Sequence, residues 1–198
     1  MRAALLRIVP REQPDDESAD LIYRLGNGDD GALREVYRRH HESVRVFANR
    51  LVNDVAAAED LVHDVFVALP RAIRRFRREV PLRQFLVGMA VNHARHHVRA
   101  AVRRRRAQES LARQPLPPTA TPDRLVENEE LGRALIAALD RLPLDQRVAF
   151  VLCEVEERTS HDAARIVGVK DENMRGRVRR ARQALRGFLA DWQTEEHT

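Results

Sequence analysis

The chain has 198 residues, of which 43% are hydrophobic and 33% are charged, and its formal net charge is +5. This length allows one domain or two small ones, and the composition is that of a chain that folds in water. No run of about 18 apolar residues occurs, which excludes a membrane-spanning helix, and a single cysteine, Cys153, excludes an internal disulfide framework. We expect a cytoplasmic protein, because residues 1–9 are too short and too basic for a signal peptide.

The charge alternates along the chain. Residues 1–66 contain 13 acidic residues and 9 arginines, a net of −4, whereas residues 71–106 contain 12 arginines and one acid, a net of +11. Residues 123–157 are acidic again, with 9 acids against 4 arginines. Such alternating blocks indicate a chain that holds a polyanion and also docks on a protein.

The N-terminal part of the chain predicts a tail and two helices. Residues 1–19 are charged and contain two prolines, which predicts a flexible tail. A short helix is predicted at 20–25, and Asp29 or Asp30 is expected to cap a longer helix at about 32–51. The apolar stripe of that longer helix consists of Leu33, Val36, Tyr37, Val44, Phe47 and Leu51.

Two further helices are predicted before the middle of the chain. One covers about 56–78 and is expected to be kinked or divided at Pro70, because proline has no N–H for the helical ladder. The other covers about 82–106. Its apolar stripe consists of Phe85, Leu86, Met89, Ala90, His93 and His97.

A linker and a second helical segment follow. Residues 107–128 contain four prolines among Thr and Ala, which predicts a flexible linker. Residues 129–190 return to helical periodicity, with one helix opening at Pro143, and 191–198 are predicted to be a tail. The fold class is therefore all-α, with two small helical domains joined by a flexible linker.

The most informative pattern within 129–190 is a helix, a short turn and a longer helix. Thr159 or Ser160 is expected to cap the first helix, and Gly168 breaks it where the chain must turn. The second helix is predicted at 171–189, with arginines off its apolar stripe. A helix that crosses the phosphate backbone before a second helix that enters the major groove is the helix-turn-helix arrangement. An ordinary bundle with a solvated basic helix would give a similar pattern.

The sequence contains no recognisable catalytic or metal-binding set. It has no phosphate-cradling glycine loop, no nucleophile elbow and no paired-histidine zinc motif, so we expect no enzyme and no cofactor. The histidines His93, His96 and His97 have a spacing that could gather imidazoles, but no acid lies beside them in sequence. We expect no metal there.

The second domain resembles that of a bacterial sigma factor of the extracytoplasmic-function (ECF) group, in the sigma-70 family. The resemblance covers 139–189 and rests on Leu142-Pro143, Gln146-Arg147, Asp162 to Val169, Arg177, Arg180-Ala181-Arg182 and Leu185. Residues 20–106 resemble the promoter-melting domain of the same group. The resemblance of this first domain rests on Gly28-Asp29, Ala58-Glu59-Asp60-Leu61-Val62, Asp64-Val65-Phe66, Phe85-Leu86 and Ala90-Val91-Asn92. Two motif sets in the right order are far more specific than either alone.

The resemblance implies a dissociable initiation subunit of RNA polymerase, with three sets of site residues. The polymerase core, its beta and beta-prime subunits, would be bound by Glu59, Asp60, His63 and Asp64. The minus-ten element would be melted and read by Arg77, Arg78, Asn92, Arg95, His96, Arg99 and Arg103. The minus-thirty-five element would be read by Glu172, Asn173, Arg175, Gly176, Arg179 and Arg180.

The chain departs from the pattern of the group at several of these positions. Phe85 stands where a tryptophan is usual, Glu172-Asn173 replaces Gly-Thr, and Gly176 replaces a small hydroxyl residue, so the target sequence is expected to differ. Two other functions compete with this one. A stand-alone helix-turn-helix regulator would bind duplex DNA without polymerase, and an arginine-rich RNA-binding module would need more aromatic residues than 5%.

The resemblance also implies control by a protein partner. The group usually has an anti-sigma factor, often membrane-anchored, and the predicted linker would let two domains fold around such a third body. We therefore expect promoter DNA, polymerase core and an anti-sigma factor as partners, with no small-molecule substrate, in an envelope or stress response.

Overall fold

The computed structural model describes residues 18–52, 54–109 and 137–195, and these residues form helices and connecting turns without a strand. The first group of helices is α2 (Ala19–Gly26), α3 (Asp30–Val52), α4 (Val55–Ala72), the short 3₁₀ turn η2 (Ile73–Arg75) and α5 (Leu82–Glu109). The second group is α7 (Leu144–Phe150), the π-helical turn η3 (Val151–Val155), α8 (Ser160–Val167) and α9 (Asp171–Glu195). The all-α prediction is confirmed for this part of the chain.

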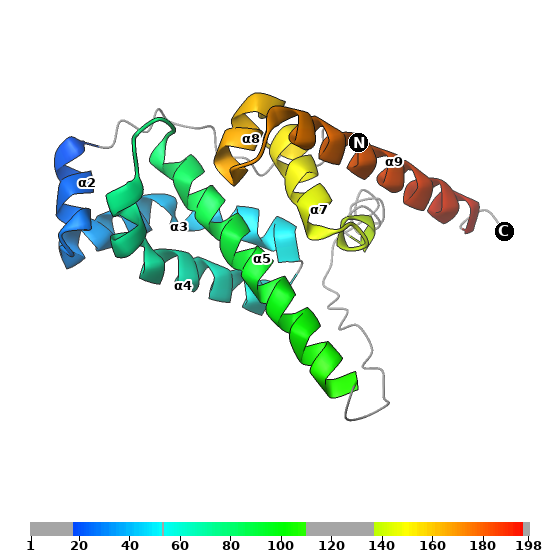
Figure 1. The fold of residues 1–198 in the computed structure, drawn as a ribbon, viewed down its shortest axis with the longest axis horizontal. Helices are drawn as coiled ribbons and strands as arrows, with labels where there is room; N and C mark the ends of the chain where they lie inside the picture. Colours follow the sequence, from blue (N-terminus) through cyan, green and yellow to red (C-terminus); the bar gives the residue numbers. More distant parts are fainter. Residues whose placement is uncertain (1–17, 53, 110–136, 196–198) are drawn as a thin grey trace, which may run out of the picture.

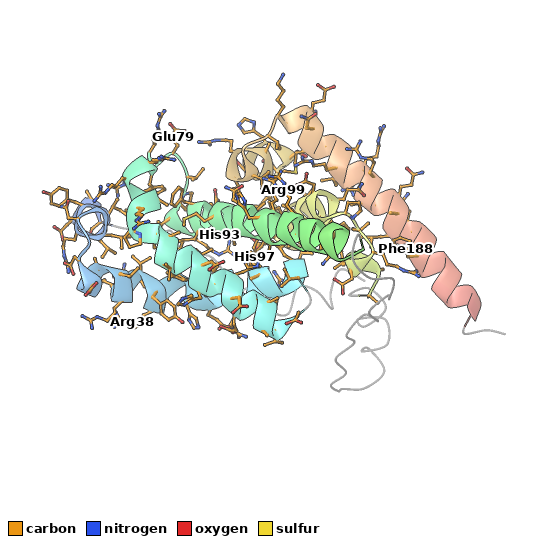
Figure 2. All side chains as sticks on the ribbon, turned by 60° about the horizontal axis from the view of Figure 1, so that its bottom comes forward. Arg38, Glu79, His93, His97, Arg99 and Phe188 are labelled. Atoms are coloured by element: carbon orange, nitrogen blue, oxygen red, sulfur yellow. The ribbon has the colours of Figure 1, made fainter. Side chains whose placement is uncertain are left out.

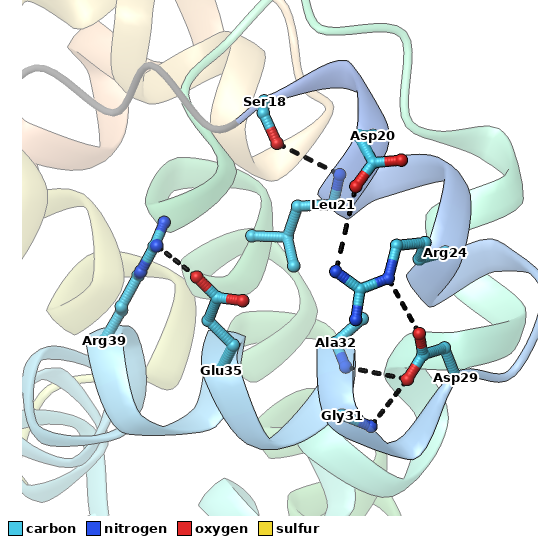
Figure 3. Close-up of polar contacts among 9 residues, drawn as sticks. All are labelled: Ser18, Asp20, Leu21, Arg24, Asp29, Gly31, Ala32, Glu35 and Arg39. Atoms are coloured by element: carbon cyan, nitrogen blue, oxygen red, sulfur yellow. Dashed lines mark hydrogen bonds and ion pairs between the residues drawn. The ribbon is translucent and has the colours of Figure 1, made fainter.

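Side-chain caps begin the first two helices of this group. The Ser18 hydroxyl accepts a hydrogen bond from the backbone N–H of Leu21 at the start of α2. One carboxylate oxygen of Asp29 accepts from the N–H groups of Gly31 (2.7 Å) and Ala32 (3.1 Å) at the start of α3 (Figure 3). These bonds satisfy N–H groups that have no partner within the helix. Of the two capping residues predicted for α3, Asp29 is therefore the one that caps.

Arg24 joins α2 to the start of α3. Its Nε lies 2.7 Å from the second carboxylate oxygen of Asp29, and the hydrogen bond from Arg24 holds the pKa of Asp29 below its usual value (Figure 3). The backbone N–H of Ala32 lowers this pKa further. The short α2 is thus fixed to its neighbour by charge as well as by the buried Leu21 and Leu25.

Helices α3, α4 and α5 enclose the core of the first unit, and α2 packs across one end (Figure 1). The largest fully buried side chains of this core are Leu25, Phe47, Leu51, Leu61, Leu69, Leu82 and Leu86. Their spacing along each helix is the 3.6-residue period that the sequence shows, so burial follows directly from the apolar stripe.

The helix predicted at 56–78 is shorter than expected. Pro70 lies inside α4 without dividing it, but α4 ends two residues later at Ala72 and continues only as the single turn η2. A proline near the last turn removes one backbone N–H from the ladder and hastens the end of the helix. Arg77 and Arg78 therefore lie in a loop, where Arg78 adopts a left-handed φ of 57°.

The second unit has the predicted helix–turn–helix at its centre. The Thr159 hydroxyl caps α8 by accepting from the N–H of Asp162 (3.1 Å), and Gly168 ends it with a φ of 70°. This left-handed conformation favours glycine because it has no Cβ. Helix α9 then packs on α7 and α8 through a stripe of buried residues: Met174, Val178, Ala181 and Leu185.

Three boundaries differ from those predicted. Helix α5 runs to Glu109, three residues into the segment predicted as a linker, and α9 runs to Glu195, into the predicted tail at 191–198. The helix predicted to open at Pro143 changes to π-helical bonding after Phe150. The predicted tail at 1–19 also ends earlier, since Ser18 caps α2 and Ala19 begins it. The rest of the predicted linker and residues 1–17 of that tail lie outside the described residues.

The two units pack directly against each other. Figure 1 shows α7 and α8 beside α5 and the end of α3, and close contacts join α8 to α5 and α7 to α3. Arg147 of α7 donates to the backbone oxygen of Leu51 in α3 (2.6 Å), and at Gly88 of α5 a Cβ would lie 2.6 Å from the backbone oxygen of Ile166 in α8. The sequence predicted two domains separated by a linker and did not anticipate this contact.

Candidate nucleic-acid interface

The leading face of α9 projects away from the core. Met174 and Val178 anchor the helix, which turns the residues between them outward. The exposed residues of this face are Glu172, Asn173, Arg175, Arg179 and Arg180, with Gly176 partly buried among them. All six residues predicted for minus-thirty-five recognition therefore lie on the first three turns of one helix.

The arginines of this face are held to different degrees. Arg175 lies 2.7 Å from Asp171 one turn earlier, although 66% of its side chain is exposed. No carboxylate of the described residues lies within ion-pair distance of Arg179 or Arg180. A Cβ on Gly176 would lie 3.6 Å from the Arg180 guanidinium, so the missing side chain leaves room for Arg180 to lie along the helix. Exposed guanidinium groups at a helix start suit bidentate contacts to guanine in the major groove.

Two other arginines of α9 serve to position the helix. Arg177 donates to the Asp145 carboxylate of α7 (2.9 Å), and Arg182 donates to Glu154 of η3. Both acids come from the segment before the helix-turn-helix. These contacts fix the orientation of α9 on its unit, and sequence periodicity could not separate them from the exposed arginines.

Helix α5 presents the residues predicted for minus-ten recognition. Asn92, His96 and Arg99 are exposed along it, and Figure 2 shows Arg99 beyond His97 towards the C-terminal half of the helix. The side chain of Arg103 lies outside the described residues. Arg77 and Arg78 are exposed in the loop before α5, at the opposite end of this surface.

Arg95 differs from its neighbours because it faces the second unit. Only 17% of its side chain is exposed, and its Nε lies 3.0 Å from the Asp145 carboxylate. Its Nη1 also donates to the backbone oxygen of Val167 (3.5 Å) and to the side-chain oxygen of Asn92 (3.4 Å). The guanidinium predicted to grip DNA is thus bound to protein in this structure.

Two histidines of α5, His93 and His97, lie against the Asp64 carboxylate of α4. His97 Nε2 lies 2.9 Å and His93 Nδ1 3.8 Å from the Asp64 carboxylate. Burial lowers the pKa of His93, while Asp64 opposes that shift. The placement of His97 on the apolar stripe was wrong, since 47% of its side chain is exposed. Within the described residues no three His, Cys, Asp or Glu side chains gather as metal ligands would.

A groove of about 580 Å³ lies between α3 and α4. Three of the four residues predicted to bind the polymerase core line it, namely Glu59, Asp60 and His63. Asp64 lies outside the groove, on the side of α4 that faces α5, where His97 binds it. The groove therefore contains most of the residues predicted to bind the polymerase core, and its floor is open to solvent.

The floor of the groove is apolar, and its residues were not among those predicted to bind the polymerase core. It is formed by Leu33, Tyr37, Val62, Phe66 and Val67. Tyr37 was predicted to point into the core, but it is 43% exposed and stacks on His41, with the ring centroids 4.8 Å apart. Val67 is 64% exposed. An apolar patch rimmed by charge is typical of a protein-binding surface.

Comparison with known proteins identifies the family. Residues 36–104 match Sigma-70 region 2, and residues 132–185 match Sigma-70 region 4. The ECF RNA polymerase sigma factor SigE of Mycolicibacterium smegmatis is 30% identical over 189 residues, which cover 92% of this chain and 72% of that protein. The chain belongs to the ECF RNA polymerase sigma factors. The ECF sigma-E factor of Escherichia coli K12 is 27% identical over 83% of this chain and 90% of its own length.

Solved structures have the same fold. The sigma factor RpoE of Bartonella quintana, solved with the anti-sigma factor NepR, superimposes with a TM-score of 0.61 at 23% identity, over 79% of this chain and 96% of that one. CnrH, solved with the cytosolic domain of CnrY, gives a TM-score of 0.59 at 21% identity, over 87% and 96%.

The sigma-factor assignment decides between the functions that the sequence left open. This chain is an RNA polymerase sigma factor that directs the polymerase to promoters, and a stand-alone helix-turn-helix regulator is not favoured because both sigma regions are present in order. Region 2 corresponds to α3, α4 and α5, and region 4 includes α7, α8 and α9. Among the described residues, no helix combines the length and apolar character needed to cross a membrane.

Proposed function

We propose that this sigma factor binds the polymerase core through the groove between α3 and α4. The observation that supports this role most strongly is the combination of exposed Tyr37 and Val67 with Asp60 at the rim. Apolar contact supplies the binding energy, and the acids select a basic partner surface. The partner would be a helical surface of the beta or beta-prime subunit, with Glu59 and His63 beside Asp60.

We propose that α9 reads duplex DNA at the minus-thirty-five element. Helix α8 would cross the phosphate backbone, and the exposed face from Glu172 to Arg180 would enter the major groove. Arg175 and Arg180 would contact base edges, while Arg179 would contact phosphate. Glu172 and Asn173, at the very start of the helix, would contribute to base choice because Glu accepts from cytosine and Asn pairs with adenine.

We propose that α5 and the loop before it hold the opened strand at the minus-ten element. Asn92, His96 and Arg99 are exposed in one row along α5, and Arg77 and Arg78 extend this surface at its N-terminal end. Arg95 and Arg103 would complete it. Single-stranded bases are held by polar contacts and stacking, with arginine supplying charge along the backbone.

The remaining roles are proposed from the family. Residues 20–106 and 129–190 would act as separate units around residues 107–128 during initiation, in the cytoplasm, and bond formation would belong to the polymerase. An anti-sigma factor would hold the chain inactive until an envelope or stress signal arrives. One structural relative was solved with such a partner, the anti-sigma factor NepR.

Two exposed valines of α4 allow a matched test of the core-binding groove. Val67→Asp puts a charge on the apolar floor, whereas Val55→Asp changes an equally exposed valine (69%) at the start of the same helix. Both substitutions leave the buried core intact. We expect Val67→Asp to weaken binding of purified core polymerase by about tenfold or more, as loss of a central contact does. Equal affinities of the two variants in a core titration would refute the assignment of the groove.

A further inference from the structure

Lysine occurs only once in this chain. The sequence has 35 lysine and arginine residues, and all of them except Lys170 are arginines. Arginine stays protonated and spreads its charge over a planar guanidinium, whereas the amine of lysine can lose a proton and act as a nucleophile. Lys170 is therefore the only side-chain amine that an acyl donor can modify.

The turn between α8 and α9 holds Lys170 in a fixed place. The N–H groups of Gly168 and Val169 both bond to the backbone oxygen of Ala164, the second at 3.0 Å. Val169 packs against the core, and the backbone oxygen of Lys170 accepts from the N–H of Met174 (3.1 Å) in the first turn of α9. Lys170 thus lies directly before α9, on a backbone that is hydrogen-bonded on both sides.

The side chain of Lys170 is accessible. It is exposed to solvent, and in the part of the chain that the structure describes no carboxylate lies within ion-pair distance of its amine. The neighbouring acid, Asp171, binds Arg175 instead (2.7 Å). Because no carboxylate holds the amine, a small acyl donor can approach it.

The position of Lys170 suits a contact with a phosphate of bound DNA. This step rests on the proposed function, in which α9 enters the major groove. Asn173, proposed to contribute to base choice, follows three residues later, or about 4.5 Å along the helix axis. The major groove is about 12 Å wide and is bordered by phosphates, so an exposed cation at the start of α9 can reach its edge. Such contacts position a protein on DNA without reading sequence.

The amine of Lys170 contributes little to the fold. The aligned peptide dipoles of a helix place partial positive charge at its start, where a cation is mildly unfavourable. Asp171 and Glu172 supply the favourable negative charge in the first turn of α9. The bond to Met174 uses the backbone oxygen of Lys170, which a change in the side chain leaves intact. Loss of the charge should therefore affect DNA binding and leave folding unchanged.

We propose that Lys170 is an acylation site, at which an activated acyl donor neutralises a phosphate contact of α9. The donor is an acyl phosphate or an acyl thioester. The amine first loses a proton to water, and its nitrogen then attacks the acyl carbon. An N–C bond forms, the bond from that carbon to phosphate or sulfur breaks, and the phosphate or thiol leaves with the electron pair while the nitrogen releases a second proton. The amide is neutral, so the DNA phosphate loses its cation.

Mass spectrometry of the treated full chain tests the site. The chain is incubated with acetyl phosphate and, in parallel, with acetyl coenzyme A. We expect an acetyl group on Lys170 and none at that position in Lys170→Arg, which keeps the cation but cannot accept the acyl group. Circular dichroism should give acetylated and untreated chains the same thermal midpoint. An unmodified Lys170 after both treatments would overturn the proposal, and a lower midpoint would assign the amine a structural role instead.

Binding of the holoenzyme to a promoter fragment tests the consequence. Each chain is assembled with core polymerase, and its affinity for a promoter from which it initiates is measured over a range of salt concentrations. Acetylated wild type and Lys170→Gln should bind about tenfold more weakly, as loss of a charged hydrogen bond implies. The slope of log K against log salt should shrink by about 0.9. Lys170→Arg, treated with the same donor, should bind as untreated wild type does.

Three outcomes would count against the contact. Equal affinities of acetylated wild type and treated Lys170→Arg would refute it, even with Lys170 modified. A loss confined to fragments with an intact minus-thirty-five element would place Lys170 on a base edge, because a phosphate contact weakens binding to all sequences alike. If untreated holoenzyme did not protect the minus-thirty-five element, the proposed function of α9 would fail and this contact with it, whereas the peptide masses would still decide whether Lys170 accepts an acyl group.

Discussion

Arg147 makes the most quantitative prediction about stability. Its side chain is 10% exposed, and its two terminal nitrogens bind the Leu51 oxygen (2.6 Å), the Asp140 carboxylate (2.7 Å) and the Asp140 backbone oxygen (2.7 Å). Arg147→Met preserves the aliphatic length but removes all three bonds. Asp140 is 35% exposed and can turn to water, whereas the buried Leu51 oxygen loses its charged donor.

The expected cost follows from these partners. A buried acceptor left unpaired costs about 1–3 kcal/mol. Burial already lowers the pKa of Arg147, so the charged form has a desolvation cost that methionine avoids. Because this relief offsets part of the penalty, we expect a net loss of about 1–2 kcal/mol in the free energy of unfolding. With an m-value of about 2 kcal/mol per molar urea, the midpoint falls by about 0.5–1 M.

Urea denaturation followed by circular dichroism measures this loss. Arg38→Met is the control, because Arg38 is an exposed arginine on α3 and its replacement should change stability by less than about 0.5 kcal/mol (Figure 2). If Arg147→Met were as stable as Arg38→Met, the three hydrogen bonds would contribute nothing and the account of this residue would be refuted.

Four further predictions concern single residues. Thr159→Ala removes the cap of α8 and should cost about 1 kcal/mol in thermal unfolding; an unchanged midpoint would contradict this. Arg180→Ala should cost about 1–3 kcal/mol at the minus-thirty-five element in footprinting, whereas Arg186→Ala, further along α9, should leave the footprint intact. Asn92→Ala should bind polymerase normally but reduce permanganate reactivity of unpaired thymines, and equal reactivity would reject its role. Burial, and after it the Glu154 carboxylate, raises the pKa of the Cys153 thiol to about 11. Because the thiolate is the reactive form, alkylation of Cys153 should speed up until about pH 11, and at pH 8 it should be about 100-fold slower than alkylation of a free thiol with a pKa of 9. A rate equal to that of the free thiol would show an exposed thiol.

Local rules predicted the features that depend on neighbouring residues. The cap at Thr159, the left-handed turn at Gly168 and the stripe from Met174 to Leu185 all follow from spacing and residue type. The exposed face of α9 follows from the same stripe, since residues that are not buried must point outward.

Features that depend on residues distant in sequence could not be predicted in this way. Arg147 and Arg95 read as ordinary charges, yet one binds a carbonyl 96 residues away and the other binds Asp145, 50 residues away. Tyr37 has helical core spacing, but it lies in the floor of the groove, where its ring meets that of Phe66 edge-on with the centroids 4.8 Å apart. Helical periodicity gives the direction of a side chain and not the partner that it meets.

Reconstituted transcription tests the central claim most directly. Core polymerase from the host would be supplied with sheared genomic DNA, with and without the chain, and the 5′ ends of the transcripts would be mapped. We predict discrete start sites that require the chain, each with a shared sequence near minus ten and another near minus thirty-five. Start sites that do not change when the chain is added, together with tight binding of the chain alone to duplex DNA, would contradict its role as a sigma factor.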